Sequence, residues 1–229
     1  MYPRLLAAIS AALLFLLTPV SAEPPAPYQA QYRAFASGLP CGQGEIELKR
    51  LSPGQYQYSA SGKICSMGPR ASHQSLFTYD DRKILPQRYE TVLDGVWRDR
   101  HLAGIQQEGV FVQTLNGEPL PLELPFHPAQ WEPTLLIHQL GLARSSVQLS
   151  YTWGEETRDY LFEYLGEETL ETKLGQLKTH KFEQDHPHKQ RVAQFWFAPQ
   201  LNDALVQVKV SRLGIPWLTV ELSAYQAAP

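Results

Sequence analysis

The chain lacks most of the features from which a chemistry can be deduced. It contains only two cysteines, and its formal net charge is −3 across 229 residues. A charge so close to balance gives no general attraction to nucleic acid, so we exclude nucleic-acid binding from the expected functions. The sequence contains no Gly-x-Ser-x-Gly elbow, His-Glu-x-x-His helix or glycine-rich phosphate loop. We therefore expect no catalytic residues, no enzyme activity and no cofactor.

The start of the chain predicts export. Arg4 precedes the apolar run 5–17, and the small residues 20–22 offer a peptidase site before Glu23. A retained membrane anchor is the alternative, but the run is shorter than the roughly 20 residues that a spanning helix needs. The absence of cysteine at the cut disfavours a lipoprotein. We expect a signal peptide over 1–22, cleavage near Ala22, a periplasmic location and no membrane span afterwards.

The remaining length suits a single core. Residues 23–27 are proline-rich and are expected to form a flexible leader, and residues 28–226 are expected to form one β domain. In an exported protein, two thiols without a third partner most often form a bridge, so we expect a Cys41–Cys65 disulfide. A redox-active pair is the alternative, although such pairs usually have Cys-x-x-Cys spacing.

Alternation with a period of two recurs along the chain and predicts half-buried strands. In the segment 28–34, for example, Tyr and Ala alternate with Gln and Arg. Asp94-Gly95 and Asn116-Gly117 are the clearest hairpin signals. The expected strands are 28–37, 43–50, 55–64, 75–79, 87–93, 96–103, 110–115, 146–153, 158–165, 175–183, 191–197, 204–211 and 217–223.

The alternation stops once, near the middle of the chain. Leu136, Ile137 and Leu140 share a face at helical spacing, and Gly141 follows as a candidate stop. We therefore expect one short helix over 134–141. The predicted fold is mainly β: a strongly curved antiparallel sheet or a barrel of about a dozen strands with one short helix.

A run in the second half of the chain resembles a known family. It comprises the segment 164–172 (YLGEETLET), Leu174-Gly175, Lys178, Phe182 and the segment 195–199 (FWFAP), together with Tyr28-x-Ala30-x-Tyr32. These residues resemble the bacterial exported family of domain of unknown function 3108, which brings no assigned catalytic residue, ligand or cofactor. Within this run we interpret 166–169 as a strand connection and Pro199 as the end of a strand. The expected shape is also similar in architecture to the outer-membrane lipoprotein carriers, which have a curved sheet and an enclosed helix.

Two groups of polar residues are candidate sites. The segment from His180 to His188 holds imidazoles and carboxylates, but its spacing fits no zinc pattern, and a solvated hairpin tip is the preferred interpretation. His73 has Ser72 and Ser75 as close neighbours in the sequence. We expect no hydrolytic site there, because sequence neighbours in a strand alternate faces.

Aromatic residues are the most suggestive feature for function. Core packing explains most of them, but some could line a cavity on the concave face of a curved sheet, with the helix as a plug or lid. The favoured hypothesis is a periplasmic protein that binds a lipid, another apolar small molecule or an envelope component. The alternatives are a scaffold that holds an envelope protein by strand addition, and an enzyme of unrecognised type. The candidate ligand-binding residues are Tyr32, Tyr58, Trp97, Phe162, Phe195 and Trp217.

Overall fold

The structure is a computed structural model, and it confirms a mainly β fold. It describes residues 24–64, 70–80, 83–95, 99–107, 110–120, 124–125, 130–131, 133–153, 156–186 and 189–228. Within these ranges sixteen strands join into one sheet, accompanied by one α-helix. Three of the strands contain only two residues, so the prediction of about a dozen strands holds for the longer ones.

The elements follow one another as a long meander interrupted by the helix. Their bounds are β1 (Tyr28–Ala36), β2 (Leu39–Ser52), β3 (Gln55–Ile64), β4 (Arg70–Asp80), β5 (Lys83–Asp94), β6 (Arg100–Gln107), β7 (Val110–Leu115), β8 (Glu118–Pro119), β9 (Leu124–Pro125), β10 (Gln130–Trp131), α1 (Pro133–Leu142), β11 (Val147–Trp153), β12 (Glu156–Thr172), β13 (Gly175–His186), β14 (Arg191–Ala198), the 3₁₀ turn η2 (Pro199–Leu201), β15 (Ala204–Arg212) and β16 (Ile215–Ala227).

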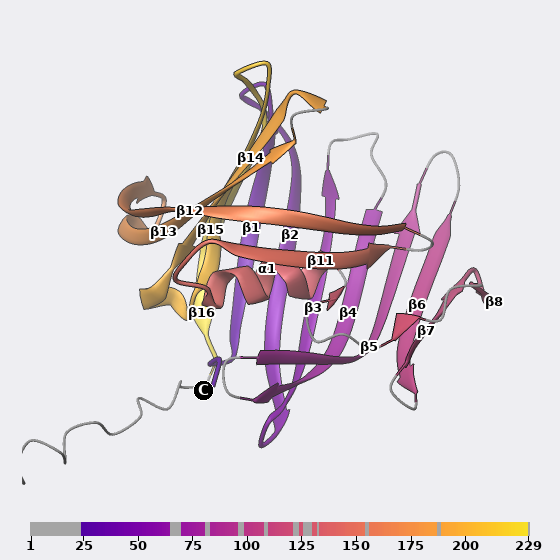
Figure 1. The fold of residues 1–229 in the computed structure, drawn as a ribbon. Coiled ribbons are helices and arrows are strands. Elements are labelled where there is room, and N and C mark those ends of the chain that lie inside the picture. Colours follow the sequence, from indigo (N-terminus) through magenta and orange to yellow (C-terminus); the bar gives the residue numbers. More distant parts are fainter. Residues whose placement is uncertain are drawn as a thin grey trace, which may run out of the picture.

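The spatial order explains how the chain builds one curved wall. Strands β1 to β8 run outward from β1 in sequence order, and β11 to β16 return so that β16 pairs with the other side of β1. All ladders are antiparallel except the two-residue β10–β11 pair. The segment that crosses from one end of the sheet to the other carries α1, and it places the helix inside the curve, behind β11 and β12 (Figure 1).

The sheet is strongly curved but not closed. Within the described ranges β8 and β10 stand at opposite ends of the strand order, and no ladder joins them. Of the two architectures expected from the sequence, a curved sheet or a barrel, the described residues form the open curved sheet.

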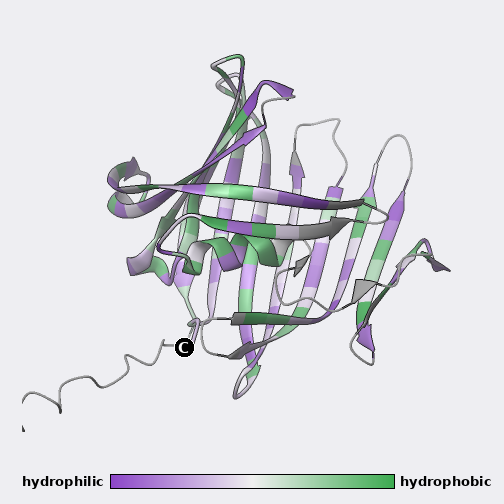
Figure 2. Ribbon diagram, in the orientation of Figure 1, coloured by the Kyte–Doolittle hydropathy of each residue, from purple (hydrophilic) through white to green (hydrophobic). Residues whose placement is uncertain are grey.

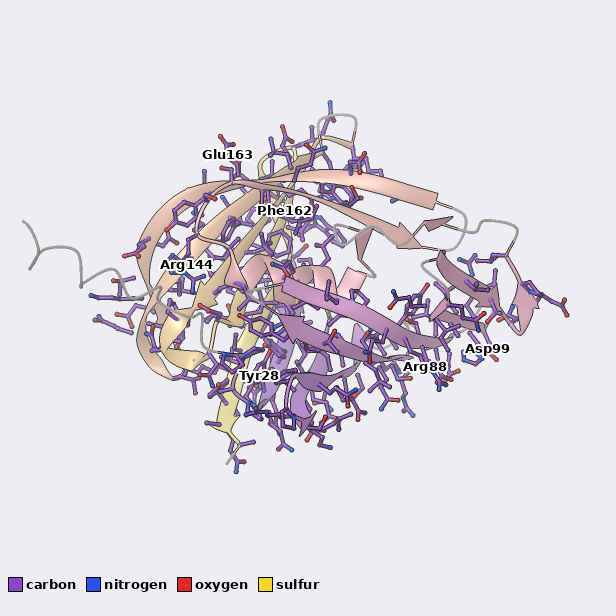
Figure 3. All side chains as sticks on the ribbon, turned by 60° about the horizontal axis from the view of Figure 1, so that its bottom comes forward. Tyr28, Arg88, Asp99, Arg144, Phe162 and Glu163 are labelled. Carbon is purple, nitrogen blue, oxygen red and sulfur yellow. The ribbon has the colours of Figure 1, made fainter. Side chains whose placement is uncertain are left out.

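Side-chain alternation separates an inner from an outer face. Hydrophobic residues alternate with polar ones along the strands, whereas α1 is hydrophobic over most of its length (Figure 2). Phe162 and Glu163, which are successive residues of β12, lie on opposite sides of the strand, with Phe162 toward the interior (Figure 3). Phe162 is 1% exposed, as expected for the inner face of a half-buried strand.

One predicted connection is wrong. Residues 166–169 lie within β12, which runs without a break from Glu156 to Thr172. Gly166 adopts φ +99° at a register shift in the β12–β13 ladder, which is a β-bulge. Glycine followed by two glutamates therefore marks a bulge in a long strand and not its end. Pro199 does end β14, as expected, and begins the turn η2.

No helix among the described residues has both the length and the hydropathy needed to cross a membrane.

Candidate ligand-binding face

The inner face of the first half of the sheet is built from rows of residues that pair across the strands. One row runs Tyr28–Leu48–Tyr58–Ser75–Tyr89–Gly104–Gln113 from β1 to β7. Every residue of this row except Gly104 is at most 2% exposed. The row begins with aromatic and aliphatic side chains and becomes hydroxyl- and amide-bearing toward β7.

The second half of the sheet lines the same interior with aromatic rings. Tyr164, Phe182 and Phe195 pair across β12, β13 and β14. The Phe162 and Phe195 rings meet edge to face with centroids 5.7 Å apart, a favourable aromatic geometry. The interior is therefore aromatic on the β12–β14 side and more polar on the β4–β7 side.

Helix α1 occupies the space between these two walls. Leu135 and Leu140 are completely buried, and Leu136 is 4% exposed. The helix contacts β5 of the first half and also β11 and β15 of the second half. The prediction of one helix is confirmed, and the apolar residues that predicted it are those that fill the curve.

His138 is the polar residue at the centre of this packing. Its ring lies 5.5 Å from the Tyr58 ring and 6.0 Å from the Phe77 ring, measured between centroids. Burial without a compensating charge lowers the pKa of His138 to about 4, so the imidazole is neutral at pH 7. Its Nε2 atom is buried and has no hydrogen-bond partner among the described residues.

Two further buried polar atoms on the inner face also lack partners in the part of the chain that the structure describes. The Tyr56 hydroxyl is one, and the Tyr56 ring stacks on Phe77 with centroids 5.4 Å apart. The other is Gln113 Nε2, whose Oε1 accepts a hydrogen bond from the Tyr89 hydroxyl at 2.7 Å. Buried polar groups are normally paired, so each of these atoms calls for a reason.

The C-terminal end of α1 is fastened to the loop before β15. Arg144 donates from Nη2 to both carboxylate oxygens of Asp203, at 2.7 and 2.8 Å, and from Nη1 to the carbonyl of Gly141 at 2.8 Å. Figure 3 shows Arg144 beside the end of the helix. Nearer the middle of the helix, Gln139 Oε1 accepts a hydrogen bond from the Ile84 backbone at 3.2 Å.

Gly141 has a different role from the expected helix stop. The helix continues through it to Leu142, and Gly141 does not adopt a positive φ. A Cβ atom at this position would lie 2.7 Å from the Asp203 carbonyl and 2.9 Å from Phe197 Cδ1. Glycine is therefore required because the helix approaches β14 and the β15 loop too closely for any side chain.

His73 and Ser75 do converge, contrary to our expectation for this segment. They are two residues apart, share the inner face and approach to 2.6 Å between Nε2 and Oγ, while His73 Nδ1 lies 2.7 Å from Thr91 Oγ1. Ser72 does lie on the other face. Ser75 is 1% exposed and lies in a strand whose backbone pairs with both β3 and β5.

The six candidate ligand-binding residues do not form one group. Tyr32, Tyr58, Phe162 and Phe195 are buried in the core, and the Tyr32 hydroxyl donates to the Leu205 carbonyl at 2.9 Å. Trp97 lies outside the described residues. Trp217 is 44% exposed near the end of the β15–β16 hairpin and therefore does not line the interior.

The predicted disulfide is not present in the described part of the chain. Cys41 is half-buried and free, and Cys65 lies outside the described residues. The β2–β3 ladder ends with the pair Gly42 and Ile64, which are the chain neighbours of the two cysteines. The bridge therefore remains a prediction.

The segment from His180 to His188 is not a single polar cluster. His180 is 6% exposed and its Nδ1 lies 2.9 Å from the Tyr164 hydroxyl, on the opposite face from Glu183. His188 lies outside the described residues. Among the residues that are described, no group of three or more His, Cys, Asp or Glu side chains is arranged to hold a metal ion.

A groove of about 620 Å³ lies on the outer face, across β16 and β1 to β5. Its side chains are mostly glutamine, serine and glutamate, including Gln29, Glu47, Ser59 and Gln74. Hydrogen bonds from Lys49 and Gln29 hold the pKa of Glu47 below its ordinary value. Sequence analysis had no signal for this groove, because such residues are ordinary on the wet face of a strand.

Comparison with known proteins identifies the architecture. Neither a family model nor a curated protein matches the chain, so the resemblance to domain of unknown function 3108 remains a prediction. A solved structure that is similar is a β-barrel-like protein of domain of unknown function DUF1849 from Brucella abortus, with 12% identity, a TM-score of 0.56, and coverage of 89% of this chain and 98% of that one. Another is a protein with a YmcC-like fold from Bacteroides fragilis that is predicted to be exported, with 9% identity, a TM-score of 0.36, and coverage of 87% and 95%. The first similarity shows a β-barrel-like fold and nothing about ligands.

Proposed function

We propose that this chain is a periplasmic carrier or receptor that binds a lipid or another apolar molecule on its inner face, in the space that α1 fills here. The observation that carries the proposal is α1 itself. A short helix with a buried leucine face is enclosed by an open sheet, and it fills a space that an acyl chain could occupy. In this account the helix is a displaceable occupant.

Two polar features lower the cost of displacing α1. Burying the unpaired Nε2 of His138 costs about 1–3 kcal/mol relative to a satisfied site, so the inserted position is less stable than an apolar residue would make it. The fastening at the end of the helix is a partly exposed ion pair between Arg144 and Asp203, which contributes at most about 1 kcal/mol. A ligand must also replace the burial of Leu135, Leu136 and Leu140, which contributes about 1.5–3 kcal/mol for each side chain, so only a ligand of comparable apolar area displaces the helix.

The two walls of the interior also suggest how a ligand would lie. Aromatic rings of Phe162, Phe182 and Phe195 suit an apolar chain. The unpaired Gln113 Nε2 on the other side offers a donor to a carbonyl or phosphate oxygen. The best match is an amphiphile with its polar group toward β7.

The scaffold alternative receives less support from the edges of the sheet. At one edge of the sheet, the two-residue strands β8 and β9 pair with the outer side of β7. At the other edge, the two-residue strand β10 pairs with β11. Very short edge strands are a common protection against strand addition.

The test uses an apolar fluorescent probe, N-phenylnaphthylamine, with the chain from Glu23, which contains every described residue. Wild type is expected to bind the probe. Arg144→Ala is expected to bind it about two- to fivefold more tightly, because displacement of α1 then costs less. Arg88→Ala, which removes an exposed arginine 4.0 Å from Glu90 on the outer face, is the matched control and should leave binding unchanged. Failure of both wild type and Arg144→Ala to bind would contradict the proposal.

A further inference from the structure

Three turns gather at one end of the molecule and form a protruding tip. The tip comprises residues 36–43 at the β1–β2 turn, 189–192 at the start of β14 and 211–218 at the β15–β16 turn. The Ser37 N–H donates to the Trp217 carbonyl at 3.0 Å, and the Leu213 N–H donates to the Gln190 carbonyl at 3.0 Å. Figure 1 shows the β1–β2 hairpin in indigo and the β15–β16 hairpin in yellow projecting together at the top.

Large apolar side chains are concentrated on this tip. Leu39 is 72% exposed, Ile215 is 69%, Leu213 is 67% and Trp217 is 44%, and these are four of the nine most exposed large hydrophobic residues in the described part of the chain. Singly scattered exposed leucines need no explanation, but a contiguous apolar patch marks an interaction site.

The backbone at Leu213 gives an independent reason to assign this patch a function. Leu213 adopts φ +53° before Gly214 at φ +76°, a turn geometry that favours Asn-Gly. The same chain uses that pair at Asn116-Gly117, with φ values of +55° and +86°. A leucine at a left-handed position is unfavourable for the turn and is exposed to water, so neither the turn nor the core accounts for its presence.

The charges around the tip are mainly positive, although the exposed Asp185 pairs with Val192 at its edge. Within its three segments Lys189, Arg191 and Arg212 are positive, and no aspartate or glutamate occurs. Lys189 and Arg212 are exposed. The tip thus combines exposed leucine, isoleucine and tryptophan side chains with neighbouring basic residues. This combination suits an anionic bilayer, because tryptophan favours the membrane interface and Lys and Arg pair with lipid phosphates.

We infer that this tip inserts into the surface of an anionic lipid bilayer. It projects from the molecule and offers a row of side chains on two turns, which suits insertion between lipid headgroups. The tip residues are separate in sequence and position from α1 and the inner face, so the inference stands apart from the proposed ligand site.

The experiment is co-sedimentation of the chain from Glu23 with vesicles of phosphatidylethanolamine and phosphatidylglycerol at a ratio of about three to one. The key variant is Leu213→Asn, which supplies the residue that the turn prefers and should leave the thermal unfolding temperature unchanged or higher. It is expected to reduce the vesicle partition coefficient about tenfold, and Ile215→Asn should act similarly. Arg212→Gln should cost about fivefold on these vesicles, since one basic residue near an anionic surface contributes about 1 kcal/mol.

Leu51→Asn is the matched control, because Leu51 is 53% exposed on β2, at the end of that strand away from the tip. It should bind vesicles as wild type does. Arg144→Ala should also leave sedimentation unchanged, which separates this surface from the ligand site. Wild type that does not sediment, or Leu213→Asn that sediments as wild type does, would overturn the inference and leave a protein partner as the occupant of the tip.

Discussion

At the scale of single residues, His138 has the most consequences. It is buried, and its ring lies near those of Tyr58 and Phe77. Desolvation lowers the pKa of His138 to about 4 from an ordinary value of 6.5. Protonation is therefore coupled to any motion that brings the imidazole into water.

This coupling predicts that the free energy of unfolding falls in acid because His138 is buried in its neutral form. Between pH 6.5 and about 4 the unfolded state binds a proton at His138 while the native state does not, so stability falls as the pH is lowered through this window. At about 1.36 kcal/mol per pH unit the loss reaches about 3 kcal/mol near pH 4 and then levels off. Urea unfolding of wild type and His138→Leu across pH 4–8 measures it.

The comparison with His138→Leu isolates this group, because His180 and His186 also have lowered pKa values, caused mainly by desolvation, and both remain in the variant. His138→Leu should be more stable than wild type at pH 7, since it removes the unpaired Nε2 atom. Its stability should also fall less between pH 6.5 and 4. Parallel curves for the two proteins would show that His138 is not the source of the acid sensitivity.

Gly141 gives a second prediction at this scale. Alanine in a helix is ordinarily about 1 kcal/mol more favourable than glycine, yet here its Cβ would meet the Asp203 carbonyl and Phe197. Gly141→Ala should therefore destabilise the protein by about 1–3 kcal/mol in thermal or urea unfolding. A gain in stability would mean that the close contact between the helix and β14 is not maintained in solution.

At the scale of elements, alternation predicted the strands well because each has one dry and one wet face. The strands 55–64 and 110–115 were predicted with their observed bounds, and the helix was predicted to within a residue at each end. Strand order and bulges were beyond sequence analysis, because alternation gives the face of a residue and not its partner. The prediction that Trp217 lines the interior was wrong for this reason. Trp217 lies at a register shift in the β15–β16 ladder, where alternation no longer predicts which face a side chain occupies.

The convergence of His73 with Ser75 could have been predicted, since residues two apart in a strand share a face. The contact of His73 with Thr91 could not have been predicted, because Thr91 lies on β5 and the sequence does not specify the register of the β4–β5 ladder. The unpaired atoms of Tyr56, Gln113 and His138 were equally unpredictable, because they depend on what each side chain fails to reach in the folded interior.

The bulge in β12 gives a prediction for an element. Gly166 has φ +99° and no atom within 4 Å of where a Cβ would lie, so a substitution there meets backbone strain alone. Gly166→Ala should lower the free energy of unfolding by about 1–3 kcal/mol. Leu165→Ala, at the neighbouring exposed position, should change it by less than about 0.5 kcal/mol. Equal effects of the two substitutions would contradict a specific requirement for glycine.

At the scale of the whole molecule, the chain forms one open curved sheet whose two arms meet at the β1–β16 ladder. The crossing segment lays α1 across the interior, where Arg144 donates to the Gly141 carbonyl and pairs with Asp203, and Gln139 accepts a hydrogen bond from the Ile84 backbone. The sheet supplies a rigid wall, and the helix is the element whose removal would open an apolar face. The tip at the end of the β1–β2 and β15–β16 hairpins gives the same molecule a separate surface for lipid.

Hydrogen exchange over residues 133–142, followed by mass spectrometry with and without phosphatidylethanolamine, tests most directly whether α1 is a displaceable occupant. Without lipid, the amides of α1 should be protected as part of the core. With bound lipid, they should exchange markedly faster while those of β12 to β15 remain protected. Lipid that binds at saturation and leaves the protection of α1 unchanged would contradict the account.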